Sequence, residues 1–150
     1  YGNDFGKVGY DAIIQAEAGF MFMNGEPDSP PTKMPVALVD VLAGHQLKEG
    51  ILLALLGRMQ TGEGAYIEVS LFDSAVSALV NQATNWLNAG HTPVRMGSEH
   101  PNIVPYGSIF MTKDEKLITL AVGTDKHFAM LCNLLDISEL ADSEKFATNA

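Results

Sequence analysis

The chain has 150 residues, 47% of them hydrophobic, so it has enough apolar side chains to build a core and is not disordered. Nine Lys and Arg against eighteen Asp and Glu give a formal net charge of −9, and the nine basic residues are scattered. This argues against nucleic-acid binding, which needs a clustered basic face.

No apolar run reaches the roughly 18 residues of a membrane span, so we expect no membrane partner. The single cysteine, Cys132, excludes an internal disulfide and fits a reducing compartment. We expect a soluble protein of the cytoplasm, or of the mitochondrial matrix in a eukaryote. Because the chain starts at Tyr1 rather than Met and residues 146–150 form no closing element, we also expect both ends to be cut.

The first half is predicted to be mainly helical. A glycine-containing loop over 1–9 leads into a mostly buried helix over 10–22, with Ala12, Ile13, Ala16 and Phe20 as its apolar residues. Glycines and prolines break regular structure over 24–35. Helix resumes near Asp40 and runs to about Gln60. Its apolar face is formed by Leu47, Ile51, Leu52, Leu55 and Leu56.

A turn over 60–64 closes that helix, and the period-2 alternation of residues 66–69 predicts a strand. Ser70 then starts another helix, because its hydroxyl can accept a hydrogen bond from the amide of Asp73 three residues on. The predicted buried stripe of this helix consists of Val76, Leu79, Val80 and Ala83.

The second half begins with a predicted linker around 90–105, which has prolines and glycines but no periodicity. Two strands, 107–111 and 117–122, are predicted to form a hairpin. Thr124 is expected to cap a helix over 125–135, and a short helix is expected after Ser138. The order of elements favours α/β for the first part of the chain and α+β for the second.

Asp40 is the first candidate for chemistry. It follows the apolar, strand-like run 36–39 and precedes a helix, so its carboxylate is expected near free amides that favour an anion and can stabilise developing negative charge. The ordinary alternative is that Asp40 only caps the helix.

Tyr10 and Asp11 open the first helix in a similar way, and Gly9 lets a ligand approach the backbone; an ordinary helix start is again the alternative. No second ligand stands at metal spacing from His45, so we expect no metal site.

Several motifs are informative through their order along the chain. They are Gly9-Tyr10-Asp11, Val36-Ala37-Leu38-Val39-Asp40, Thr61-Gly62-Glu63-Gly64, Glu68-Val69-Ser70-Leu71-Phe72-Asp73 and Ile103-Val104-Pro105-Tyr106. In this order they resemble the middle of family III (CaiB/BaiF-type) coenzyme A transferases over essentially the whole chain, and residues 97–106 are similar to the succinate-dependent, dicarboxylate-using members.

The resemblance implies that Asp40 is a nucleophile, which takes CoA from an acyl-CoA as an aspartyl-CoA thioester and passes it to a carboxylic acid. It also implies that Lys7, Val8, Gly9 and Tyr10 contact CoA. The thioester is then a substrate, and no permanently bound cofactor is expected. With the family in view, a catalytic Asp40 is favoured over a mere cap.

The racemase branch of the same superfamily carries a histidine where this chain has Tyr10, so transferase is favoured over racemase or epimerase. A non-catalytic scaffold subunit is the alternative from another class. The family fold implies a Rossmann-like large domain containing residues 1–88, a linker over 89–103 and the start of a small domain over 104–150. It further implies an interlocked homodimer.

Overall fold

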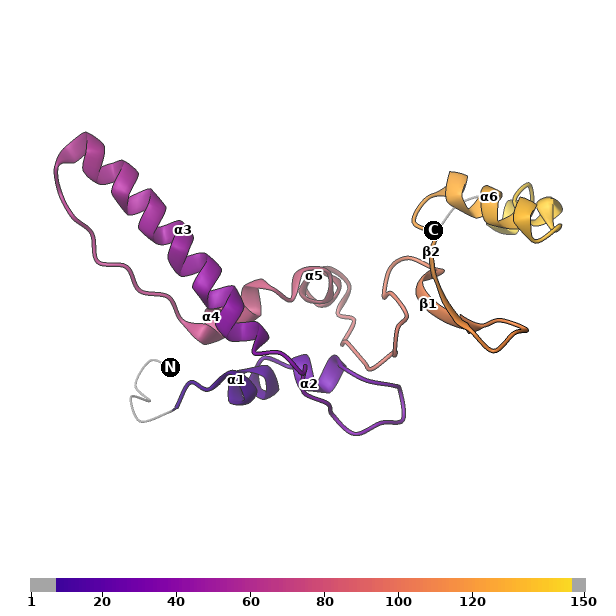
Figure 1. Ribbon diagram of the computed structural model, residues 1–150, viewed down its shortest axis with the longest axis horizontal. Helices are drawn as coiled ribbons and strands as arrows, with labels where there is room; N and C mark the ends of the chain where they lie inside the picture. The colour runs from indigo at the N-terminus through magenta and orange to yellow at the C-terminus, as the bar shows by residue number, and fades with distance from the viewer. Residues whose placement is uncertain (1–7, 147–150) are drawn as a thin grey trace. The chain divides into compact units, whose positions relative to one another are not determined.

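The computed structural model describes residues 8–146, and the chain divides into two compact units after Arg95 (Figure 1). The division falls inside the segment 89–103 that the sequence marks as a linker. The assignment of the two units to a large and a small domain stays a prediction. None of the helices within 8–146 combines the length and the apolar composition needed to cross a bilayer.

The first unit begins with two short helices, α1 (Asp11–Glu17) and α2 (Phe20–Met23). The single helix predicted over 10–22 is therefore wrong. Gly19 has φ +87°, a left-handed conformation that ends one helix and starts the next and that glycine adopts without steric cost. The inward residues differ too: Ala12, Ile13 and Ala16 are exposed, and the buried ones are Ile14 and Gln15.

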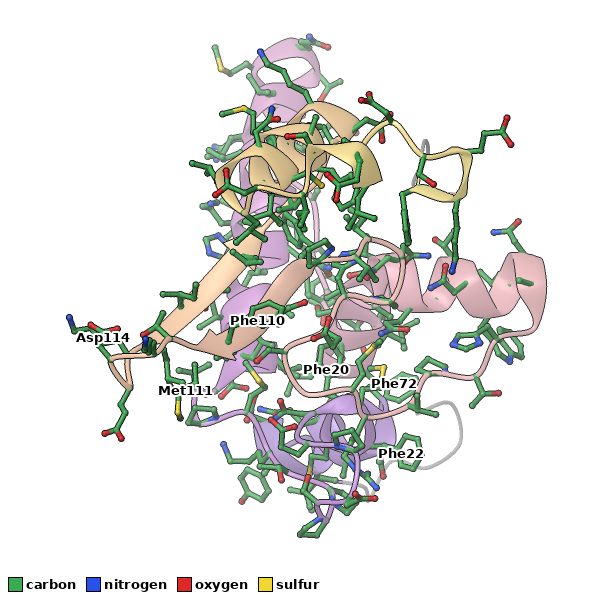
Figure 2. The ribbon with its side chains drawn as sticks, turned by 90° about the vertical axis from the view of Figure 1, so that its right-hand side faces the viewer. Phe20, Phe22, Phe72, Phe110, Met111 and Asp114 are labelled. Atoms are coloured by element: carbon green, nitrogen blue, oxygen red, sulfur yellow. The ribbon has the colours of Figure 1, made fainter. Side chains whose placement is uncertain are left out.

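The core of the first unit is small and lies where α1 meets the starts of α3 (Leu38–Thr61) and α4 (Leu71–Ser77). Each helix contributes one buried apolar residue: Ile14, Val39 and Ala75. Partly buried hydrophobic residues surround them, among them Phe20 and Phe72, labelled in Figure 2. The start of α3, which carries Asp40, is thus held against α1.

The middle of α3 packs through small residues, whereas nearer its start Leu38 and Leu42 are partly buried. Gly50 lies so close to Ile67 that an added Cβ would stand 2.9 Å from Ile67 Cγ2, and Ala54 on the next turn is partly buried. The predicted leucine and isoleucine face exists but is exposed. Gly62, with φ +78°, ends the helix in a left-handed cap.

The strand predicted over 66–69 is not formed. These residues alternate as expected, with Ile67 and Val69 partly buried and Tyr66 and Glu68 exposed, but no neighbouring strand within 8–95 pairs with them. The segment instead returns beside α3 towards α4 (Figure 1). The alternating burial of residues 66–69 therefore reflects an extended backbone that lies against α3, and not a strand in a sheet.

Ser70 caps α4 as predicted, accepting a hydrogen bond from the Asp73 amide at 3.2 Å. The predicted continuous helix is wrong, because α4 ends at Ser77 and a second helix, α5 (Val80–Ala89), begins at a residue with φ +38°. The predicted buried stripe is only partly formed, since Leu79 and Ala83 are partly buried but Val76 and Val80 are exposed. Ser74 and Ala75 are the buried residues of α4, and Val80 is 67% exposed.

The second unit contains the predicted hairpin, formed by antiparallel strands β1 (Tyr106–Met111) and β2 (Leu117–Ala121). Asp114 lies at its tip (Figure 2). Thr124 caps α6 (Asp125–Leu134) by accepting from the His127 amide at 3.2 Å, as predicted. The expected short helix after Ser138 is a 3-10 turn, Ser138–Leu140, and a second one covers Glu144–Phe146.

Candidate active site

Asp40 lies in the first turn of α3, two residues inside the helix, because the helix begins at Leu38. The expected junction after a strand-like run is therefore wrong. The carboxylate is exposed and forms no hydrogen bond or ion pair with any residue that the structure describes. The N-terminal end of a helix attracts negative charge, so an anionic group of a ligand can also bind at this position.

The capping of α3 falls to a different carboxylate. Ala37, at the N-cap position, has no side chain that can accept a hydrogen bond. Asp11 on α1 supplies one: its Oδ1 accepts from the Val39 amide at 2.9 Å. The alternative in which Asp40 merely caps its helix is weakened, because Asp11 already performs that role.

Gln15 extends the contact from Asp11. Its side-chain amide is fully buried and donates through Nε2 to Asp11 Oδ2 at 2.8 Å and to the Val36 carbonyl at 3.2 Å. Its Oε1 accepts from the Met34 amide at 2.9 Å. Gln15 was not predicted as a site residue; the signal for it is a polar residue four positions after Asp11, between Ile14 and Ala16.

The backbone amides at the start of α3 differ in their partners. The Leu38 amide donates to the Val36 carbonyl and the Val39 amide to Asp11. Across the described part of the chain, the Asp40 amide has no acceptor. A free N–H at this point can donate to an oxyanion that forms on a bound substrate.

Of the four predicted CoA contacts, Lys7 lies outside the described residues. Val8, Gly9 and Tyr10 are exposed and lead into α1, and Tyr10 is 68% exposed. Gly9 packs near Leu71, since a Cβ there would stand 3.4 Å from Leu71 Cδ1. The structure brings this segment close to the start of α3, because Asp11 accepts a hydrogen bond from the Val39 amide. Tyr10 and Asp40 are the sequence neighbours of these two residues.

Asp40 does not line either of two cavities that lie one within each unit. The cavity of the first unit has a volume of about 420 Å³ and is almost wholly apolar. It is lined by Ala18, Gly19, Phe22, Met23, Val76, Leu79, Gln82, Ala83, Trp86, Leu87, Thr92 and Pro93. The cavity of the second unit, about 610 Å³, lies between residues 101–105 and α6. The Asp40 side chain is exposed and contributes to neither of these cavities.

Within residues 8–146, no three His, Cys, Asp or Glu side chains come close enough together to hold a metal ion. His45 Nδ1 instead lies 3.1 Å from Lys48 Nζ on the same helix. At the start of α3, the polar groups that the structure describes are the Asp40 carboxylate and backbone amides.

The comparison with known proteins identifies the family. The model of CoA-transferase family III matches residues 1–150, and the chain belongs to this family. It is 45% identical over 142 residues to a succinate–glutarate CoA-transferase of Agrobacterium fabrum, a match that covers 95% of this chain and 35% of that protein. It is 37% identical to a mouse succinyl-CoA:glutarate CoA-transferase, covering 95% and 32%. The chain thus spans about a third of the length of these relatives.

A comparison with solved structures gives the same family. A CaiB/BaiF family protein from Brucella suis superposes with a TM-score of 0.73 at 42% identity, covering 99% of this chain and 39% of that one. This similarity confirms the α/β class expected from the sequence, and the family match confirms the resemblance from which that expectation came.

Proposed function

We propose that the whole protein transfers coenzyme A from an acyl-CoA donor to a carboxylic acid, with Asp40 as the covalent nucleophile. The observation that carries the proposal is the exposure of the Asp40 carboxylate and its lack of a structural partner among the described residues. The carboxylate lies in the first turn of α3, while Asp11 caps the helix. A carboxylate kept out of structural contacts in this way is available to attack a substrate.

The proposed reaction has four balanced steps. A carboxylate oxygen of Asp40 attacks the thioester carbonyl, the C–S bond breaks, and CoA departs as a thiolate. A mixed anhydride of Asp40 and the donor acid remains. The thiolate then attacks the Asp40 carbonyl, which releases the donor acid and forms an aspartyl-CoA thioester. An acceptor carboxylate displaces CoA thiolate from that thioester, giving a second anhydride. The thiolate finally attacks the acceptor's carbonyl and regenerates the Asp40 carboxylate.

Each step passes through a tetrahedral oxyanion, which needs hydrogen-bond donors. The unpaired amide of Asp40 is one candidate donor. The positive end of α3 supports both the resting carboxylate and the oxyanion.

The names of the relatives suggest the substrate class. Since the chain resembles succinate–glutarate and succinyl-CoA:glutarate CoA-transferases, we propose dicarboxylic acids as substrates, with succinyl-CoA as donor and glutarate as the first acceptor to test. The CoA moiety is proposed to contact Lys7, Val8, Gly9 and Tyr10. CoA enters and leaves as a substrate, so the reaction requires no permanently bound cofactor.

We also propose a homodimer with interlocked subunits. The exposed face of α3 supports it: Leu52, Leu55 and Leu56 are each at least half exposed in this chain, and such a contiguous apolar face is normally covered. Light scattering on the full-length protein tests the stoichiometry, and a monomer at micromolar concentration would contradict it.

The function is tested by incubating the full-length protein with succinyl-CoA and measuring its intact mass. A covalent CoA adduct that disappears on adding glutarate, and that Asp40→Asn does not form, is the expected result. A racemase would instead exchange the α-proton of a branched acyl-CoA with deuterated solvent and form no adduct. A scaffold would do neither, and Asp40→Asn would leave its behaviour unchanged.

A further inference from the structure

We propose that Asp11 and Gln15 are positioning residues for the reaction: together they fix the first turn of α3 so that Asp40 can act as nucleophile. The inference rests on the proposed function of Asp40. It adds two residues that do not touch the reacting atoms, and it predicts a kinetic effect that differs from loss of the nucleophile.

The two side chains form a complete network. Asp11 Oδ1 accepts from the Val39 amide and Asp11 Oδ2 accepts from Gln15 Nε2. Gln15 Nε2 also donates to the Val36 carbonyl, and Gln15 Oε1 accepts from the Met34 amide. Both carboxylate oxygens and both polar atoms of the carboxamide are therefore used.

The burial of Gln15 makes this network specific. Its side chain is 0% exposed, and a buried polar atom that loses its partner pays a desolvation penalty that water cannot relieve. Segment 34–36 therefore has one favourable position against α1. Met34 and Val36 precede α3 directly, so this position sets where the helix begins.

The network acts next to the nucleophile. The amide that Asp11 holds belongs to Val39, and the Val39 side chain is buried in the same core as Ile14. The Val39 backbone is thus fixed by a hydrogen bond and by packing at once, and Asp40 follows it directly. A small rotation of this turn displaces the Asp40 carboxylate and its free amide together.

Further along α3, other contacts hold the helix independently. Gln46 Oε1 lies 2.9 Å from the hydroxyl of Ser74 on α4, and Gln46 Nε2 donates to Ser77 at 2.8 Å. Loss of the Asp11 contact is therefore expected to loosen the first turn while leaving the rest of α3 against α4. This separation makes a positioning role distinguishable from a purely structural one.

The test uses the full-length protein with succinyl-CoA and glutarate. Asp11→Asn places an amide donor opposite the Gln15 amide; whichever way Gln15 turns, one donor faces another. We expect kcat to fall about 10- to 100-fold, as for displacement of a reacting group by about an ångström. The rate of adduct formation should fall equally, with a much smaller change in KM.

The charge-balanced double variant Asp11→Asn with Gln15→Glu provides a rescue. The asparagine amide introduced at position 11 can donate to the new carboxylate, which still accepts from the Met34 amide. The Val36 carbonyl, however, then faces a carboxylate oxygen instead of a donor, so the rescue is expected to be partial. We expect this variant to recover at least part of kcat. Asp11→Ser is the second single variant, to be measured if Asp11→Asn yields no folded protein.

Ser74→Ala is the matched control, because it removes a buried hydroxyl from the other contact between α3 and α4. We expect it to lower the melting temperature without lowering kcat. The inference is overturned if Asp11→Asn keeps full kcat, if Ser74→Ala loses as much kcat, or if the double variant recovers nothing. Asp40→Asn separates the two proposals: if it still turns over, the nucleophile is wrong, whereas an inactive Asp40→Asn beside a fully active Asp11→Asn refutes only the positioning role.

Discussion

The Asp11 carboxylate accepts a hydrogen bond from the Val39 amide at 2.9 Å, across 28 positions of sequence. This contact joins two motifs that the sequence presents separately, the segment around Tyr10 and the segment that ends at Asp40. The two acidic residues therefore have different roles. Asp11 caps α3, whereas the Asp40 carboxylate forms no hydrogen bond or ion pair with the residues that the structure describes. The proposed chemistry depends on this difference.

The contact between Gly50 and Ile67 is expected to govern how the segment after α3 packs. A Cβ at Gly50 would stand 2.9 Å from Ile67 Cγ2, so Gly50→Ala should gain helix propensity but lose packing. Ile67→Ala removes the obstructing methyl group. A double-mutant cycle followed by urea unfolding should give a favourable coupling of about 0.5–3 kcal/mol. Additive effects of the two substitutions would contradict the proposed close packing.

Gly107 in β1 is expected to tolerate no side chain. Its φ is +93°, and an added Cβ would collide with the Ser98 carbonyl oxygen, a backbone atom that cannot turn aside. Gly107→Ala should therefore destabilise the second unit by at least about 2 kcal/mol in thermal unfolding. Gly123→Ala is the control, because its Cβ would make only an ordinary 3.5 Å contact with Tyr106. Equal stability of the two variants would contradict this account.

Asp114 at the hairpin tip is expected to titrate below the usual range of aspartate. The Lys116 ammonium, 2.7 Å from Oδ2, lowers its pKa most, and the Thr112 hydroxyl, which donates to Oδ1 at 2.6 Å, adds to this. Because the folded pKa is lowered, any stabilisation is present above the unfolded pKa and is lost as the pH falls through the folded one. The group is fully exposed, so the effect on stability is small.

Carboxyl-detected NMR titration measures this shift directly. Lys116→Gln should raise the pKa of Asp114 towards its usual value, and Lys113→Gln, a neighbouring charge change outside the contact, should raise it much less. Equal effects of the two variants would show that general charge, and not the Lys116 contact, lowers the pKa.

Local signals in the sequence predicted local structure well. The caps at Ser70 and Thr124 and the hairpin over 106–121 are all formed. These features depend on residues only a few positions apart, so their physics is contained in the sequence pattern. The breaks at Gly19 and Val80 were missed, because apolar periodicity continues across both.

Burial could not be predicted in the same way. The predicted leucine and isoleucine face of α3 is exposed, and the middle of the helix packs through Gly50 and Ala54 instead. Periodicity identifies an apolar face but not which surface covers it. At the candidate site, Asp40 and Tyr10 were selected from motifs, whereas the contact of Asp11 and Gln15 with residues 34–39 depends on tertiary structure and left only a weak signal.

The central claim is that Asp40 carries CoA, and one tryptic peptide tests it. Cleavage after Lys33 and Lys48 releases residues 34–48, in which Asp40 is the sole acidic side chain, whereas Asp11 lies in the preceding peptide. The full-length protein is incubated with succinyl-CoA, reduced with borohydride to convert an aspartyl thioester into an alcohol, digested and analysed by mass spectrometry. The account predicts the reduced residue in peptide 34–48. Reduction confined to another peptide, or none at all in a protein that transfers CoA, would contradict it.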